Sequence, residues 1–329
     1  MTEQPTITSS TCRICGGAAA KTFDAKEMMF GTREVFNYFT CADCGCVQIT
    51  DIPGDLSPYY PDNYYSYGIN KKRVRPWKKF VRNARSCYAV ERKGIWGPLF
   101  SWRDKADPLL IMYGDLGVKL SDRVLDIGGG GGGHVWLMRQ AGFSNALAVD
   151  PFLAEDMIVD GETLAVKADV FSYQGTADFI TFHHSYEHMT DPLGVLARTR
   201  DLLADDGRVL IRVPTVTSEA WDEYGTDWVS MDPPRHLFLF SHDSLKRVAA
   251  DCGFKVEKLW CDSNAFQFWG SEQYRRDIPL EDPRSYSQNP SASIFSAADI
   301  AAFETRAREL NAKMRGDSVC LLLKKDTAR

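Results

Sequence analysis

The sequence predicts an α/β fold built on a mostly parallel sheet and preceded by a small metal-binding module. Three observations lead to this prediction. From residue 123 onward, short apolar runs alternate with amphipathic segments, which is typical of strands separated by helices. The first of these runs ends in six consecutive glycines, residues 128–133. Near the N-terminus, two pairs of cysteines have the spacing of metal ligands.

Size and composition allow one large folded domain with additions. The chain has 329 residues, of which 44% are hydrophobic and 12% aromatic, and this is enough to bury a full core. No apolar run reaches membrane-spanning length, and residues 1–10 lack the basic start and apolar centre of a secretory signal. We therefore expect a cytoplasmic protein whose nine cysteines are reduced.

The first element is a cysteine module. Cys12 and Cys15 form one C-x-x-C pair, Cys41 and Cys44 form another, and a glycine after each pair permits a tight turn. This pattern predicts a structural four-thiolate site for Zn²⁺, which would supply folding energy to a segment too small for its own core. Cys46 is a spare thiol that could replace a ligand, although the spacing favours Cys44. Redox thiol chemistry is the alternative.

A connector follows the module. Residues 55–67 are rich in Tyr, Pro and Asp, and the tyrosines could stack on a sugar ring or nucleobase or simply pack a domain junction. Residues 71–93 hold ten Lys or Arg and one acid, which leaves 29 basic and 43 acidic residues, a net charge of -14, for the remainder. We expect a helix with one apolar stripe there, either docked on the domain or attracting an anionic partner. A nucleotide-sugar diphosphate or a lipid-linked glycan at a membrane surface is favoured over RNA, which the acidic remainder would repel.

The main domain begins with a strand at 123–127, a glycine turn and a helix at 134–141 that is stopped by Gly142. Asp191 is expected to cap a helix that ends near Leu203, and residues 205–207 are expected to turn the chain into the next strand. The other predicted strands are 146–150, 164–168, 178–182, 208–213, 254–260 and 318–323, and the other predicted helices are 244–251 and 297–314.

The glycine turn indicates a nucleotide-containing ligand. Its glycines satisfy both the dinucleotide pattern G-x-G-x-x-G and the pattern D-x-G-x-G of proteins that bind S-adenosylmethionine (SAM). Asp126 favours SAM, because a carboxylate before the turn would repel a pyrophosphate and attract the ammonium and sulfonium groups of SAM. Asp150 follows the second strand, where a carboxylate usually accepts ribose hydroxyls, and Asp169 follows the third, near the expected adenine amino group. Each acid could instead be a turn former or a helix cap.

Taken in order, these motifs resemble the class I SAM-dependent methyltransferases. The resemblance covers about residues 116–260 and rests on residues 124–132, 149–150, 168–169, 186–192 and 202–210. It implies a Rossmann-like sheet of seven strands in the order 3-2-1-4-5-7-6, with the seventh antiparallel. The residues that it places against the cofactor are Asp126, Gly128, Gly130, Gly132, Asp150 and Asp169. The family usually has bulkier residues between its glycines, so the turn is expected to be unusually flexible before ligand binds.

The segment after the fourth strand carries candidates for the reaction centre. Methyl transfer is an in-line displacement, so the enzyme aligns acceptor and methyl carbon and, for a hydroxyl or acidic carbon, removes a proton. His188, oriented by Glu187, is the first candidate for the general base. The alternative is that this pair caps the following helix or positions SAM. His183 and His184 could face the core, the cofactor or the substrate, and we include His184 among the cofactor-binding candidates.

A second cluster lies in residues 214–242, a segment that commonly covers the acceptor pocket in this fold. Arg235 and His236 follow two prolines that stiffen the backbone. Arg235 could bind a phosphate or carboxylate of the acceptor, and His236 is a rival for the base. In the alternative interpretation, Asp232 and Arg235 only tie the loop to the body of the domain.

The sequence thus predicts a zinc-binding module over 1–54, a Tyr-rich and basic helical connector over 55–115, and a methyltransferase domain over 116–329. This arrangement resembles a bacterial group of sugar- and polysaccharide-modifying enzymes, including deoxysugar C-methyltransferases with a zinc-binding N-terminal domain. Their C-terminal sugar-binding extension is not evident here, so a sugar hydroxyl and a sugar carbon both stay open as acceptors. The resemblance implies O- or C-methylation of a sugar, nucleotide sugar, related small molecule or glycan.

Two other functions were weighed against this one. The first is a non-catalytic scaffold that holds SAM, its by-product or RNA, and the titratable clusters around His188 and His236 disfavour it. The second is nicotinamide-dependent oxidoreduction, which Asp126 disfavours.

Overall fold

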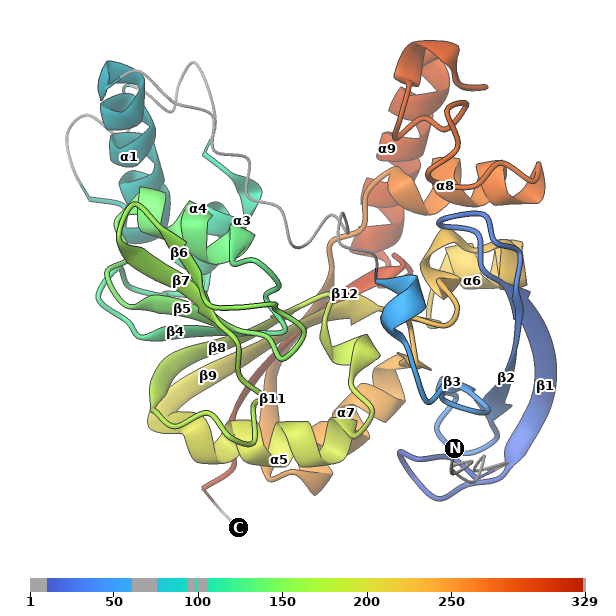
Figure 1. Ribbon diagram of the computed structural model, residues 1–329, viewed down its shortest axis with the longest axis horizontal. Helices are drawn as coiled ribbons and strands as arrows, with labels where there is room; N and C mark the ends of the chain where they lie inside the picture. Colours follow the sequence, from blue (N-terminus) through green and yellow to red (C-terminus); the bar gives the residue numbers. More distant parts are fainter. Residues whose placement is uncertain (1–10, 61–75, 94–98, 100–105, 328–329) are drawn as a thin grey trace. The chain divides into compact units, whose positions relative to one another are not determined.

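A computed structural model describes residues 11–60, 76–93, 99 and 106–327, in two compact units (Figure 1). The first unit takes its residues from 1–61, 184–197 and 211–329, and the second from 62–183 and 198–210. Among the described residues, no helix combines the length and apolar character needed to span a membrane.

The second unit contains the parallel strands that the alternating pattern predicts. Strand β4 (Val124–Ile127) pairs in parallel with β5 (Ala146–Val149) and with β8 (Ala177–His183), and β5 pairs in parallel with β7 (Glu162–Val166). All four residues of β4 are buried, which explains why this strand is almost entirely apolar and makes Asp126 its exception. Strand β6 (Met157–Val159) pairs antiparallel with β7 and was not predicted.

Three helices of this unit gather beside these strands (Figure 1). Helix α4 (Gly133–Ala141) packs on β5 and β7, while α1 (Pro76–Glu91) packs against both α3 (Pro108–Asp115) and α4. Within α1, Ala89 and Val90 are buried but Trp77 and Phe80 are exposed, so the expected apolar stripe is covered only at one end. The rest of the predicted connector, residues 61–75, 94–98 and 100–105, lies outside the described part.

The larger sheet has the strand order β11-β12-β9-β8-β4-β5-β7-β6. It therefore has eight strands in the described chain, one more than predicted, because β6 extends its edge. Strands β11 (Phe254–Cys261) and β12 (Ser318–Lys325) are antiparallel. Helix α5 (Pro192–Leu202) leads directly into β9 (Leu203–Pro214), so the predicted turn at 205–207 was wrong. Asp205 and Asp206 are exposed, so the strand includes them without burying their charge.

The cysteine module forms a second sheet in the first unit. Its order is β1 (Ala19–Lys26), β2 (Val35–Cys41), β3 (Val47–Ile49) and β10 (Phe238–Leu239), with antiparallel pairing throughout. Strand β10 comes from the segment predicted to cover the substrate. The module and that segment thus share one sheet, which local sequence patterns do not reveal.

The remaining helices of the first unit are α6 (Glu219–Tyr224), α7 (His242–Asp251), α8 (Phe266–Arg275) and α9 (Ala297–Ala312), together with short 3-10 turns that include η1 (Ser57–Tyr59), η3 (Tyr186–His188) and η5 (Val229–Met231). Three of these four helices, α6, α7 and α9, start at side-chain caps, and two of the three were predicted. The Ser241 hydroxyl accepts a hydrogen bond from Ser244 N at the start of α7, and Ser296 and Asp299 form a capping box on α9. These starts confirm the two helices predicted for this part of the chain.

Candidate active site

The glycine turn between β4 and α4 has a backbone that glycine adopts readily. Gly128, Gly130 and Gly132 have φ angles of 71°, 53° and 79°, in the left-handed region. Gly129 is needed for space, because a Cβ atom there would lie 2.7 Å from Asp126 Oδ2 and 2.8 Å from Ala148 Cβ. The run of glycines therefore brings the backbone close to the Asp126 carboxylate.

The Asp126 carboxylate is 1% exposed, and only one of its two oxygens accepts a hydrogen bond from a described residue. Thr181 Oγ1 donates a hydrogen bond of 2.8 Å to Oδ1, whereas Oδ2 is buried without a hydrogen-bond partner among the described residues. The nearest ring nitrogen, His134 Nδ1, is 3.6 Å from Oδ2. A buried carboxylate oxygen that lacks a donor suits a cationic ligand and would repel an anion.

Asp150 and Asp169 both organise turns after their strands. Asp150 accepts hydrogen bonds from Gly130 N and Phe152 N, each 2.9 Å, and so connects the second strand to the glycine turn. Asp169 accepts one of 2.7 Å from Phe171 N. Both acids therefore form turns, as the alternative interpretation expected. Their proposed contacts with the ribose and the adenine stay predictions. The exposed rings of Phe152 and Phe171, two residues after each acid, were not singled out from the sequence.

His183, the last residue of β8, and His184, which follows it, are held in different surroundings. His183 Nε2 lies 2.7 Å from the hydroxyl of the fully buried Tyr113, so this ring faces the core of the second unit. His184, in the first unit, has a positive φ of 51° and donates its N–H to Arg212 O. Its Nδ1 is 3.5 Å from Glu187 Oε1. A cofactor contact of His184 stays a prediction.

Glu187 is the centre of the cluster in the first unit. Its carboxylate is 0% exposed, and neither oxygen has a hydrogen-bond partner within the described chain. His236 Nε2 is 3.8 Å from Oε1, and the rings of His188 and His236 are 4.9 Å apart in edge-to-face contact. The structure therefore brings together Glu187, His188 and His236, three of the four residues predicted for catalysis.

Backbone carbonyls fix the proton positions on the two imidazoles. His188 Nδ1 is 2.8 Å from Arg235 O, and His236 Nδ1 is 2.7 Å from Ser230 O. Since a carbonyl can only accept, each Nδ1 carries the hydrogen, and in the neutral ring the lone pair is on Nε2. The Tyr60 hydroxyl lies 3.1 Å from His188 Nδ1. Tyr60 belongs to the Tyr-rich stretch noted in the sequence, but its place beside His188 was not predicted.

The charges in the cluster favour an ionised acid beside a neutral base. Burial favours the neutral form of Glu187, but the three neighbouring histidines outweigh it and lower the pKa of this carboxyl. Burial lowers the pKa of His188 from its ordinary 6.5, against the opposing effect of Glu187. At neutral pH, His188 is thus able to accept a proton.

Arg235 is fully buried and bound to two acids. Its guanidinium donates to both oxygens of Asp232 and, over 3.0 Å, to Glu27 Oε1, and it lies over the ring of Phe30. These partners fit the alternative in which Arg235 ties the loop to the fold. Contact between Arg235 and an acceptor stays a prediction.

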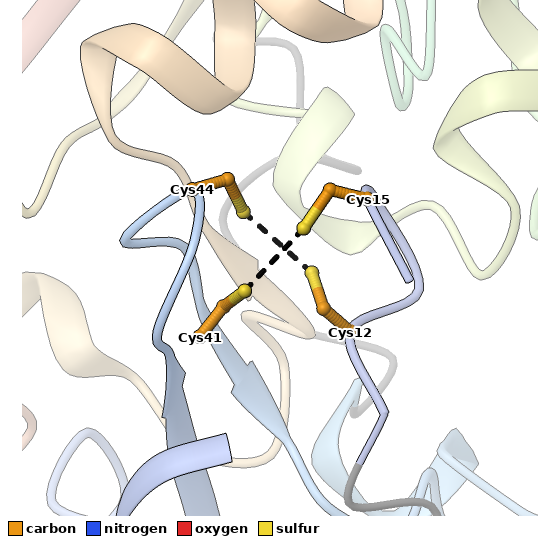
Figure 2. Close-up of side chains that lie close together, drawn as sticks. All are labelled: Cys12, Cys15, Cys41 and Cys44. Atoms are coloured by element: carbon orange, nitrogen blue, oxygen red, sulfur yellow. Dashed lines mark hydrogen bonds between the residues drawn. The ribbon is translucent and has the colours of Figure 1, made fainter. Parts of the chain in front are cut away.

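The four predicted zinc ligands lie together in the first unit. Figure 2 shows their sulfur atoms pointing toward one another from two separate stretches of chain. Cys12 Sγ is 3.6 Å from Cys44 Sγ, Cys15 Sγ is 3.4 Å from Cys41 Sγ, and all four are within 4.8 Å of one another. A tetrahedral zinc with bonds of about 2.3 Å needs sulfur atoms about 3.8 Å apart, so the cluster fits such an ion. Hydrogen bonding with Cys44 lowers the pKa of Cys12 to about 5.

Cys46 lies outside this group, as the spacing indicates. It is fully buried, and its Sγ donates to Val47 O. All nine cysteines are free.

Comparisons with known proteins bear on the second unit above all. Residues 102–259 match the family model described as a methyltransferase domain. A search of curated proteins gives no match.

Among solved structures, the chain is similar to three methyltransferases at low identity. A SAM-dependent methyltransferase from Archaeoglobus fulgidus is 20% identical, with 62% of this chain and 86% of that chain covered and a TM-score of 0.39. An O-methyltransferase of a trans-AT PKS multienzyme of Brevibacillus brevis is 13% identical, with 77% of this chain and 74% of that chain covered and a TM-score of 0.39. A geranyl diphosphate C-methyltransferase from Streptomyces coelicolor A3(2) is 11% identical, with 63% of this chain and 71% of that chain covered and a TM-score of 0.42. Similarities at this level do not decide an acceptor.

The family match covers β4 with Asp126, the glycine turn and helix α4, and it extends through β9 and into β11. The chain therefore contains a methyltransferase domain of the general SAM-dependent type, and the protein is a methyltransferase enzyme.

Proposed function

We propose that the protein transfers the methyl group of SAM to an oxygen or carbon of a sugar, nucleotide sugar or related small-molecule or glycan acceptor. The observation that carries the choice of donor is the buried Oδ2 of Asp126, which no described residue hydrogen-bonds and which lies at a turn of left-handed glycines. In this proposal the cationic end of SAM lies against Asp126 and the turn. The remaining predicted contacts are Asp150, Asp169 and His184. The observed strand order supports assigning 3-2-1-4-5-7-6 to β7, β5, β4, β8, β9, β12 and β11.

The Glu187 cluster would supply the proton acceptor. His188 and His236 each have Nδ1 bound to a carbonyl, which leaves Nε2 to take a proton from the acceptor. The acceptor oxygen or carbon then attacks the methyl carbon, the bond from that carbon to sulfur breaks, and the sulfur keeps the electron pair as S-adenosylhomocysteine (SAH) leaves. Glu187 would stabilise the imidazolium.

The sugar acceptor rests on the resemblance to sugar-modifying enzymes and on the tyrosine beside the cluster. The Tyr60 ring lies edge-on to His188 at 6.2 Å, where it could also border a sugar ring. Incubating the purified protein with radiolabelled SAM and a panel of nucleotide sugars and glycans tests this proposal. Label transferred to a nucleotide sugar or glycan supports it, and label transferred only to non-sugar acceptors contradicts it.

We expect Asp126→Asn to weaken SAM binding by about 10- to 100-fold, because an amide keeps the shape but removes the charge that faces the ligand cation. Isothermal titration calorimetry with SAM measures this change. Asp122→Asn is the matched control, because Asp122 lies just before the same strand and accepts a hydrogen bond from Lys119 N. Equal SAM affinity of Asp126→Asn and wild type would contradict the assigned role of Asp126.

We also propose that Cys12, Cys15, Cys41 and Cys44 hold a structural Zn²⁺ in a module over 1–54. The ion would connect the two C-x-x-C pairs and thereby hold the segment before β1 to the end of β2.

Cys41→Ser should remove one equivalent of zinc relative to wild type. It should also lower the midpoint of thermal unfolding, by about 2–4 °C for each kcal/mol of lost stability. Elemental analysis and calorimetry measure the two effects. Cys46→Ser is the control and should keep its zinc, because Cys46 lies outside the thiol group. Loss of the same equivalent from both variants would show that the ligand set is wrong.

A further inference from the structure

The Glu187 cluster has the composition of a metal site. We propose that Glu187, His188 and His236 bind a divalent transition-metal ion such as Zn²⁺, at a site separate from the four cysteines. One ligand atom from each of these residues lies within 4.8 Å of the others. Two imidazoles and one carboxylate are a donor set that zinc and neighbouring first-row metals prefer.

The imidazoles are oriented as metal ligands usually are. A histidine that binds a metal through one nitrogen almost always donates its other N–H to a carbonyl or carboxylate, which fixes the ring. His188 and His236 make this bond to Arg235 O and Ser230 O, at 2.8 Å and 2.7 Å. On each of these two rings, Nε2 is then the nitrogen whose lone pair can bind a cation.

The charge of Glu187 calls for a cation. Its two oxygens are fully buried without a hydrogen-bond partner among the described residues, and the ring nitrogens near them, His184 Nδ1 at 3.5 Å and His236 Nε2 at 3.8 Å from Oε1, compensate the charge only when an imidazole is protonated. The buried Arg235 is already paired with Asp232 and Glu27. Asp232 Oδ2 also lies 3.8 Å from His236 Nε2, so a second carboxylate faces the same lone pair. A divalent ion would satisfy these groups together.

Three protein ligands leave open positions on such an ion. Such an ion would act as a Lewis acid and would make a hydroxyl of the bound acceptor more acidic. This consequence rests on the proposed methyl transfer and takes the place of the imidazole base, because an Nε2 bound to a metal has no lone pair left for a proton. Metal binding itself does not rest on the proposed function.

The test is a Co²⁺ titration of the metal-free full-length protein. Thiolate ligands give intense charge-transfer absorption, whereas a nitrogen and oxygen site gives only weak ligand-field bands, so the two sites are read separately. We expect wild type to bind two equivalents and His236→Ala to bind one, with the thiolate absorption intact. His242→Ala is the control and should keep both, because His242 is on α7 and is not part of the cluster.

Glu187→Gln keeps the shape of the side chain if the alanine variant does not fold, and it should also lose only the second equivalent. Wild type that binds cobalt at the thiolate site alone would overturn the inference, and so would a second equivalent retained by both cluster variants. Metal binding can fail while labelled methyl transfer persists, in which case an imidazole is the proton acceptor. Absence of SAM binding would contradict SAM as the methyl donor and would leave the cobalt result unchanged.

Discussion

Replacing Arg235 by methionine should lower the free energy of unfolding by about 3–5 kcal/mol, because it leaves buried carboxylates without their cation. Arg235 is 0% exposed. One of its acid partners, Asp232, lies three residues before it, whereas the other, Glu27, directly follows β1. Glu27 keeps hydrogen bonds from Phe30 N and Thr32 N, so most of the loss should come from Asp232. Urea denaturation followed by fluorescence measures the change.

Two further variants separate a lost ion pair from lost packing. Arg284→Met removes an exposed arginine that is paired with Asp282 and should change stability little. Asp232→Asn added to Arg235→Met should recover part of the loss, because it neutralises the stranded acid. If Arg235→Met and Arg284→Met have the same stability, Arg235 does not hold this loop.

Removing the proton acceptor should lower kcat by about 10²- to 10⁴-fold. His188→Gln and His236→Gln are the variants to compare, since glutamine roughly preserves volume, and the base should show the larger loss. Turnover is measured as SAH released in the presence of an acceptor found in the panel. Full turnover in both variants would show that neither imidazole is needed.

The pH dependence of kcat gives the same assignment an independent check. Burial lowers the pKa of His188 below 6.5, so its neutral, proton-accepting form persists to lower pH than in a free imidazole. In the metal-free enzyme, where His188 is free to titrate, the rate should therefore fall only as the pH drops through this lowered pKa. A midpoint at or above 6.5 would point away from His188.

Much of the fold follows from local patterns in the sequence. The parallel strands β4, β5 and β8 are mostly buried, so each is a short apolar run, and the glycine turn is marked by residues that adopt left-handed angles. The cysteine spacing likewise places four thiols in one cluster. Such features are visible because the physical requirement acts on neighbouring residues.

Other features depend on contacts between distant residues and could not be predicted. Strand β10 joins the cysteine module by pairing Phe238 with Gln48, and no local pattern specifies this partner. Arg235 was a candidate for binding the acceptor because two prolines stiffen the backbone before it and a guanidinium can bind a phosphate or carboxylate. Its burial depends on Glu27, 208 residues earlier in the chain. The edge strand β6 is only three residues long, too short for a periodic signal.

Calorimetry of the wild-type protein with SAM, SAH and NAD⁺ tests the central claim most directly. The acid at Asp126 predicts binding of SAM and SAH and no measurable binding of the pyrophosphate dinucleotide. Tight uptake of NAD⁺ without affinity for SAM or SAH would contradict the account.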